Sequence, residues 1–94
     1  MALARVVSFE GVGKDRMDEM KRDMDAGERP EGVSATEFLI LHDPTADKSL
    51  AILFFDSEDD YMTSDAALNA MPAADTPGQR ASVTKYDVVA RMTV

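Results

Sequence analysis

The chain has 94 residues, which predict a single domain over 1–94, and its 18 acidic and 10 basic residues give a formal net charge of −8. This balance argues against nucleic acids and anionic membrane surfaces as partners, because both are bound by clustered Lys and Arg. The lack of cysteine excludes disulfides, thiol catalysis and the common zinc and iron–sulfur sites. The sequence shows no signal peptide and no apolar span of roughly 20 residues, so we expect a cytoplasmic location, with which the lack of cysteine is compatible.

The hydrophobic pattern of the first half predicts a strand, a helix and a second strand. The three elements are expected at Leu3–Glu10, Lys14–Ala26 and Val33–His42. Met17, Met20 and Met24 recur at i, i+3 and i+7, which places them on one face of the helix. Core packing is the ordinary use of such a stripe, and lining an adaptable apolar pocket is the alternative.

The second half repeats this order with a strand, a helix and a strand. The predicted elements are a strand over Ser49–Asp56, a helix from Ser57 that is stopped by Pro72, and a last strand centred on Val83–Met92. Ser57 is a good N-cap, with Asp60 at the position of a capping-box acid. The short segment Asp43–Lys48 predicts a hairpin connection between the two central strands.

The strand Ser49–Phe55 is apolar on both of its faces. The order βαββαβ predicts an α+β ferredoxin-like fold, in which a four-stranded antiparallel sheet has both helices on one face. One apolar set of this strand would then be exposed in a monomer, either Leu50, Ile52 and Phe54 or Ala51, Leu53 and Phe55. Exposed patches of this kind usually mark interfaces, so we expect a homodimer in which two sheets face each other and form a barrel.

The element order and three segments make the chain similar to the dimeric α+β barrel superfamily, and in particular to its antibiotic-biosynthesis monooxygenase-like domains. The segments are Ala51-Ile52-Leu53-Phe54-Phe55, Asp56-Ser57-Glu58 and Val83-Thr84-Lys85-Tyr86-Asp87-Val88. The resemblance implies a homodimer with a pocket between each sheet and its helices. Members include cofactor-free oxygenases of aromatic polyketides, haem-degrading enzymes, isomerases and proteins without known activity. This chain lacks the Trp of the oxygenases, and its only His is not on a helix as in the haem-degrading relatives.

Four residues are candidates for a catalytic site. His42 and Tyr61 could move a proton, and Asn69 and Arg5 could stabilise developing negative charge. Arg5 and Arg91 are expected on neighbouring strands, where they could neutralise an anionic ligand. Each residue also has a structural interpretation: His42 could bond a turn, Tyr61 could pack in the core with a wet hydroxyl, Asn69 could end a helix, and the arginines could pair with carboxylates.

No metal or cofactor site is predicted. The consecutive acids Glu58–Asp60 point about 100° apart on a helix, so they cannot converge on one ion. Gly11-Val12-Gly13 lacks the third glycine of a nucleotide-binding turn. The sequence therefore predicts a protein that binds a small apolar or aromatic molecule, as a cofactor-free monooxygenase-like enzyme or as a non-catalytic carrier or interaction module. Haem degradation is the third hypothesis.

Overall fold

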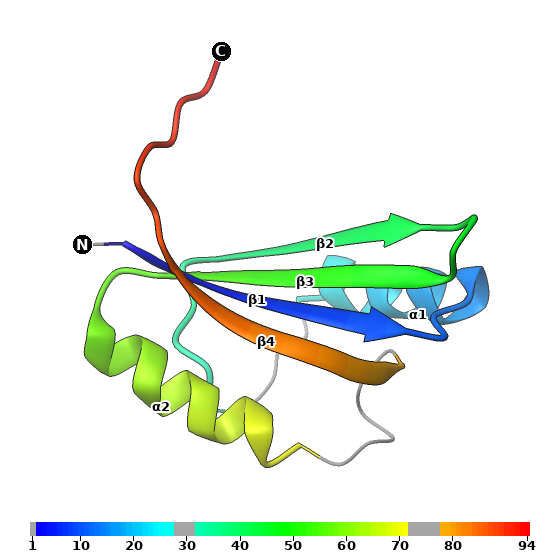
Figure 1. Ribbon diagram of the computed structural model, residues 1–94, viewed down its shortest axis with the longest axis horizontal. Helices are drawn as coiled ribbons and strands as arrows, with labels where there is room; N and C mark the ends of the chain where they lie inside the picture. The colour runs from blue at the N-terminus through cyan, green and yellow to red at the C-terminus, as the bar shows by residue number, and fades with distance from the viewer. Residues whose placement is uncertain (1, 28–31, 72–77) are drawn as a thin grey trace.

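The structure is a computed structural model that describes residues 2–27, 32–71 and 78–94. It confirms the predicted α+β class and the order βαββαβ (Figure 1). The elements are β1 (Leu3–Glu10), α1 (Lys14–Asp25), β2 (Glu37–Asp43), β3 (Lys48–Phe55), α2 (Glu58–Asn69) and β4 (Gln79–Asp87). Neither helix of this described part is long and apolar enough to cross a membrane.

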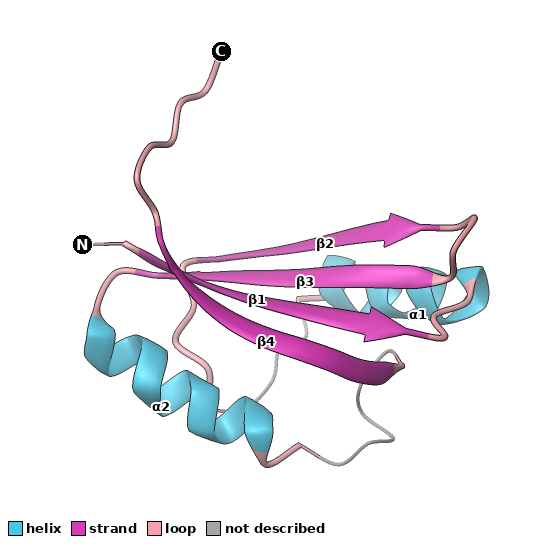
Figure 2. Cartoon of the chain, in the orientation of Figure 1, coloured by secondary structure: helices cyan, strands magenta, loops and turns pink. Residues whose placement is uncertain are grey.

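The four strands form one antiparallel sheet in the order β2-β3-β1-β4. Figure 2 shows α2 near one end of the strands and α1 near the other. Both helices lie on the same face, because Met17 of α1 and Tyr61 of α2 contact the same alternating set of strand residues. This set is Leu3, Val7 and Phe9 on β1 with Ala51, Leu53 and Phe55 on β3. The other face, which we call the open face, is covered by neither α1 nor α2, the two helices of the described residues.

The two helices differ in how firmly they are held. Ser57 caps α2 as predicted, since its hydroxyl accepts a hydrogen bond from the Asp60 N–H at 3.1 Å. Tyr61 and Ser64 of α2 are buried. No residue of α1 is buried, and its attachment rests on Met17 and on Val12 just before the helix, which is 0% exposed.

Two strand boundaries differ from the predicted ones. β2 begins at Glu37 instead of Val33, because Val33 and Ala35 pack against the core beside α2 and the Ser34 N–H bonds the Ser64 hydroxyl at 2.9 Å. β4 ends at Asp87, and the prediction that it continues to Met92 is wrong. Its partner β1 begins at Leu3, so the last backbone contact is Val88 N–H to the Ala2 carbonyl.

Residues 88–94 form a tail that leaves the sheet, as Figure 1 shows at the C-terminus. At the other end of the predicted helix, Pro72 lies outside the described residues, and α2 itself ends at Asn69.

Candidate functional site

A polar stripe on α2 faces the sheet and holds two of the predicted site residues. Tyr61, Asp65 and Asn69 follow each other at i, i+4 and i+8, and the Asn69 amide donates to Asp65 Oδ2 at 3.2 Å. Arg5 of β1 lies under this stripe and is only 3% exposed. Its Nε donates to Asp65 Oδ1 at 2.8 Å and its Nη2 to Asn69 Oδ1 at 3.0 Å. The structure thus places Arg5, Tyr61 and Asn69 in one cluster.

A second arginine joins this cluster from β4. Arg80 Nη1 donates to the same Asn69 Oδ1 at 3.0 Å, so two guanidinium groups share one amide oxygen. α2 has no basic residue in its last turn, and these two arginines supply positive charge at the negative end of its dipole. Because Asn69 donates to Asp65 and accepts from both arginines, its amide orientation is fixed.

Tyr61 closes the other end of the stripe. Its ring packs edge-on against Phe55, with centroids 5.4 Å apart, and Lys85 Nζ lies 5.1 Å from the ring centroid. Lys85 itself forms an ion pair with Glu58. Burial raises the pKa of the Tyr61 hydroxyl, the charge of Asp65 raises it further, and Arg5 and Lys85 act against this increase. At neutral pH Tyr61 is therefore a phenol that can donate a hydrogen bond but is a poor base.

His42 does not belong to this cluster. It lies near the end of β2, in register with Ser49 of β3, which is four positions from Leu53, the partner of Arg5. Four residues of a strand span about 13 Å. His42 Nε2 is 2.9 Å from the Val12 carbonyl. A carbonyl can only accept, so Nε2 carries the proton and the ring joins β2 to the segment before α1. His42 thus has a structural contact, but with the segment before α1 and not with the turn after β2 that the sequence suggested.

The expected pairing of Arg5 with Arg91 is not formed. Arg5 faces α2, whereas Arg91 lies in the tail, forms an ion pair with Glu37 at the start of β2 and covers the ring of Phe54 with its guanidinium carbon 4.5 Å from the centroid. Phe54 and Glu37 are on the open face. The Arg91 side chain therefore reaches from the tail to one end of the open face, and Arg80, not Arg91, shares a hydrogen-bond partner with Arg5.

The open face is divided into an apolar half and a half with hydroxyl groups. Strand register places Leu39, Leu41, Leu50, Ile52 and Phe54 on β2 and β3, and Ser8, Ser82, Thr84 and Tyr86 on β1 and β4. Leu39 and Leu41 are 41% and 47% exposed. Each large apolar side chain that stays in water forgoes about 1.5–3 kcal/mol of burial free energy. Of the two sets considered for β3, the one with Leu50, Ile52 and Phe54 is on this unpartnered face.

A cavity of about 360 Å³ is hollowed into the open face at the end where β2 and β3 are joined. We call it the hairpin-end hollow. Its outward-pointing lining combines two leucines, one serine and three charged groups: Leu41, Leu50, Ser8, Glu10, Asp43 and Lys48. Ala81, the extra residue where β4 changes register against β1, completes one wall. The volume is at the small end of the range for ligand sites. The cavity lies on the open face, whereas the resemblance implied a pocket between sheet and helices.

Several residues of these sites escaped the sequence analysis. Asp65 and Arg80 bond residues that are 60 and 11 positions away, and no local pattern predicts such contacts. The i+4 spacing from Tyr61 through Asp65 to Asn69 was the one available signal. Within the described ranges, no group of His, Cys, Asp or Glu side chains is arranged to hold a metal ion.

Comparisons with known proteins do not assign a family. Neither a scan against protein-family models, nor a search of curated proteins, nor a search of solved structures gave a significant match.

Proposed function

We propose that this chain is one half of a homodimer that binds a small apolar or aromatic molecule between two facing sheets. The observation that carries the proposal is the hairpin-end hollow on a sheet face whose β2 and β3 half exposes large apolar side chains. A 94-residue chain buries little more than 60% of its unfolded surface, so covering this face with a second copy adds stability that the monomer lacks. The facing of two sheets is what the resemblance to dimeric α+β barrels implies, but the proposed site lies between the sheets and not between a sheet and its helices.

The contacts that Arg5 makes with Asp65 and Asn69, beside Tyr61, favour a carrier over an oxygenase. Arg5 already donates hydrogen bonds from Nε to Asp65 and from Nη2 to Asn69, and the raised pKa of Tyr61 keeps its hydroxyl protonated. A group that stabilises a developing oxyanion must have donors available for it. We therefore propose ligand binding as the activity of the dimer.

A cofactor-free monooxygenase-like enzyme is the second candidate. Its support is that Arg5, Tyr61 and Asn69 lie together, and that the Tyr61 hydroxyl has no hydrogen-bond partner within the described residues. It predicts oxygen uptake with phenolic substrates that is lost in Tyr61→Phe. Haem degradation has less support, since His42 uses Nε2 on the Val12 carbonyl, and it predicts a Soret shift on addition of haem.

Native mass spectrometry of the purified protein tests the dimer, and titration with the neutral dye Nile red tests the apolar site. We expect a dimer that carries co-purified mass or binds the dye saturably. Leu41→Glu should yield a folded monomer without dye binding, because Leu41 is half exposed in the single chain and its substitution does not disturb the core. Met62→Glu, at a 63% exposed apolar residue of α2, is the matched control and should stay dimeric. A monomeric wild type at 100 µM, a concentration of the order at which weak dimers still form, would refute the proposal.

A further inference from the structure

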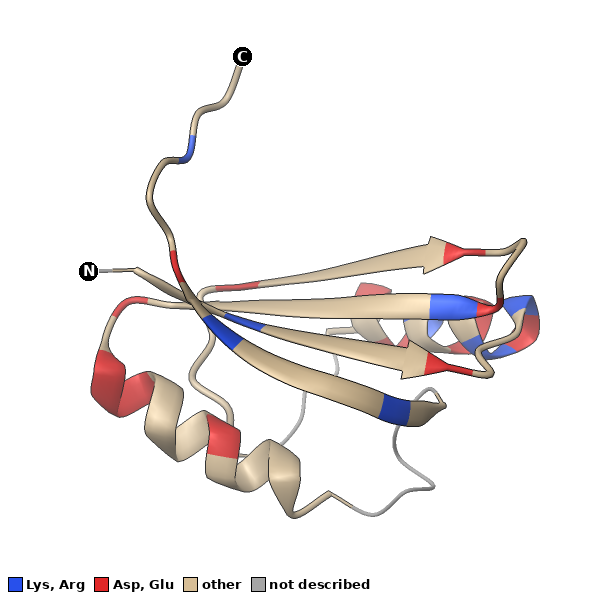
Figure 3. Ribbon diagram, viewed as in Figure 1, with Lys and Arg blue, Asp and Glu red and all other residues tan. Residues whose placement is uncertain are grey.

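One end of the open face carries a row of charges beside the hairpin-end hollow. Register places Asp43, Lys48, Glu10 and Gln79 next to each other on β2, β3, β1 and β4. Asp43 Oδ1 is occupied, because it accepts from the backbone N–H groups of Thr45 and Ala46. Lys48 and Glu10 are exposed and form no ion pair with any other described residue. Figure 3 shows acidic and basic positions together at this end of the sheet.

This row distinguishes two ways of placing a second copy on the open face. A two-fold axis across the strands lays β2 over the partner's β2 with its direction reversed, so that Asp43 meets the partner's Glu37. A two-fold axis along the strands lays the charged row of one copy over the same row of its partner, but with the strand order reversed. β3 then faces the partner's β1, and Lys48 faces the partner's Glu10 in both directions. In the first arrangement Asp43 meets a Glu37 that is already paired with Arg91, whereas the second arrangement makes two opposite-charge contacts between Lys48 and Glu10.

The strand order determines which strands face each other in this arrangement. β2 and β4 are the edge strands, so an axis along the strands lays each β2 over the partner's β4 and each β3 over the partner's β1. In the same arrangement Ile52 faces the partner's Val6, whereas Leu50 and Leu41 face the partner's Ser8 and the partner's Ser82.

We propose that in the homodimer Lys48 of each copy forms an ion pair with the partner's Glu10, and that these two pairs close the hairpin-end hollow over a bound molecule. The site is then incomplete in one chain, because part of its rim comes from the second copy. This inference rests on the proposed dimer and goes beyond it by fixing the symmetry axis and the residues that seal the site.

Charge-reversal variants test the pairing between copies. Lys48→Glu and Glu10→Lys each put like charges at both contacts, so each variant alone should dimerise at least tenfold more weakly than the wild type. An equimolar mixture of the two should form a heterodimer of wild-type strength, because each contact in it joins opposite charges. The measurement is native mass spectrometry with one variant isotope-labelled, supported by dilution in light scattering.

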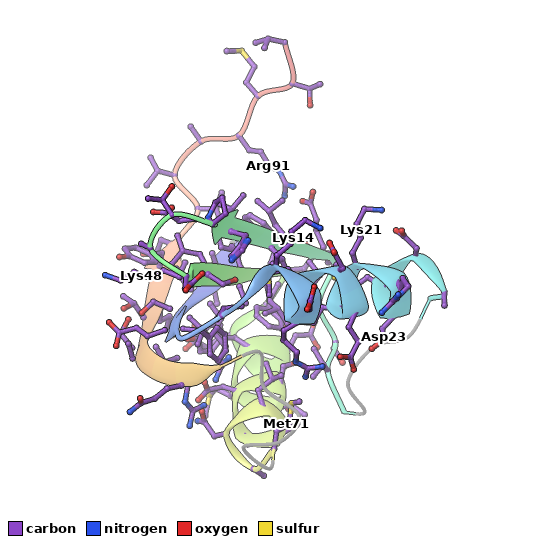
Figure 4. All side chains as sticks on the ribbon, turned by 90° about the vertical axis from the view of Figure 1, so that its right-hand side faces the viewer. Lys14, Lys21, Asp23, Lys48, Met71 and Arg91 are labelled. Carbon is purple, nitrogen blue, oxygen red and sulfur yellow. The ribbon has the colours of Figure 1, made fainter. Side chains whose placement is uncertain are left out.

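Lys14→Glu is the matched control, since it makes the same charge change on α1 and away from the open face. Figure 4 shows Lys14 and Lys48 well apart. In about 150 mM salt, where repulsion between the net charges is largely screened, the variant should dimerise like the wild type. Two results would overturn the pairing: single variants that dimerise like the wild type, or a mixture no stronger than its components. If Leu41→Glu still abolishes the dimer in either case, the proposed dimeric binding protein stands while the Lys48–Glu10 contact falls.

Discussion

Arg5 is a cation placed under a helix in an acidic chain, and its partners decide what its removal costs. Arg5→Met keeps the apolar stem of the side chain but removes the donors to Asp65 Oδ1 and Asn69 Oδ1, so that among the described residues Asp65 retains only the Asn69 amide as a donor and Asn69 Oδ1 only Arg80. Breaking a fully buried pair costs 3–5 kcal/mol, and Asp65 is 32% exposed and can be rehydrated, so we expect a loss of about 2–3 kcal/mol of unfolding free energy. Urea denaturation measures it.

Arg80 provides the comparison for this prediction, because it bonds the same Asn69 oxygen from an exposed position. Arg80→Met should cost about 0.5 kcal/mol or less, as exposed polar contacts do. Equal losses for the two variants would mean that burial of Arg5 does not determine its contribution.

Tyr61 makes the stability of the fold depend on pH in the alkaline range. Its pKa is raised above the ordinary 10.0 by burial and then by Asp65. The unfolded chain therefore loses this proton first as pH rises, and above pH 10 the folded state holds more protons than the unfolded state. Stability from this group is complete below pH 10 and is lost as pH rises through the folded-state pKa.

The chain has only two tyrosines and no tryptophan, so tyrosinate absorbance can isolate this group. In Tyr86→Phe the remaining tyrosine should titrate with a midpoint above 10.0 when folded, and near 10.0 when the same variant is unfolded in urea. Coincident folded and unfolded midpoints would mean that the surroundings of Tyr61 in the folded chain do not raise its pKa. Tyr86 is 53% exposed on the open face, so its replacement leaves the core intact.

At the scale of elements, α1 is the weakest part of the fold. None of its residues is buried, while α2 buries Tyr61 and Ser64 and is held by Arg5. Local opening needs less free energy where fewer apolar contacts break. We expect the amide hydrogens of α1 to exchange measurably faster than those of α2 in hydrogen–deuterium exchange of the intact protein. Equal protection of the two helices would show that α1 is held by contacts other than Met17 and Val12.

The elements themselves follow from periodicity, which is why their order and type could be predicted. The methionine spacing, the Ser57 cap and the apolar strands are local signals, and each produced the predicted element. The orientation of β3 could not be predicted, because both of its faces are apolar. That choice is made by β1, where Val7 and Phe9 pack toward the helices and Ser8 and Glu10 point away.

The candidate site was predictable only in part for a related reason. Tyr61, Asn69 and Arg5 were identified by residue type, and the fold brings them together, but Asp65 and Arg80 enter through contacts that only the folded chain makes. The end of β4 likewise depends on where β1 begins, which is a property of the pairing and not of the β4 sequence.

At the scale of the whole molecule, net charge opposes the proposed dimer. Two copies of charge −8 whose centres are separated by the shortest dimension of the molecule, 27 Å, repel by about 4 kcal/mol at 10 mM salt and about 0.3 kcal/mol at 150 mM, from Coulomb's law in water with Debye lengths of about 30 and 8 Å. Screening also weakens the attraction in the two exposed Lys48–Glu10 contacts, but each contributes only about 0.2–1 kcal/mol, so less attraction than repulsion is lost.

Salt should therefore strengthen the dimer, because the loss of repulsion exceeds the loss of attraction at the rim. We expect the dissociation constant to fall at least tenfold between 10 and 150 mM salt, as measured by dilution in analytical ultracentrifugation. The Lys14→Glu variant carries two more negative charges and should show a steeper dependence of the same sign. A dimer that dissociates as salt is added would mean that ion pairs, and not the apolar face of β2 and β3, supply most of its association free energy.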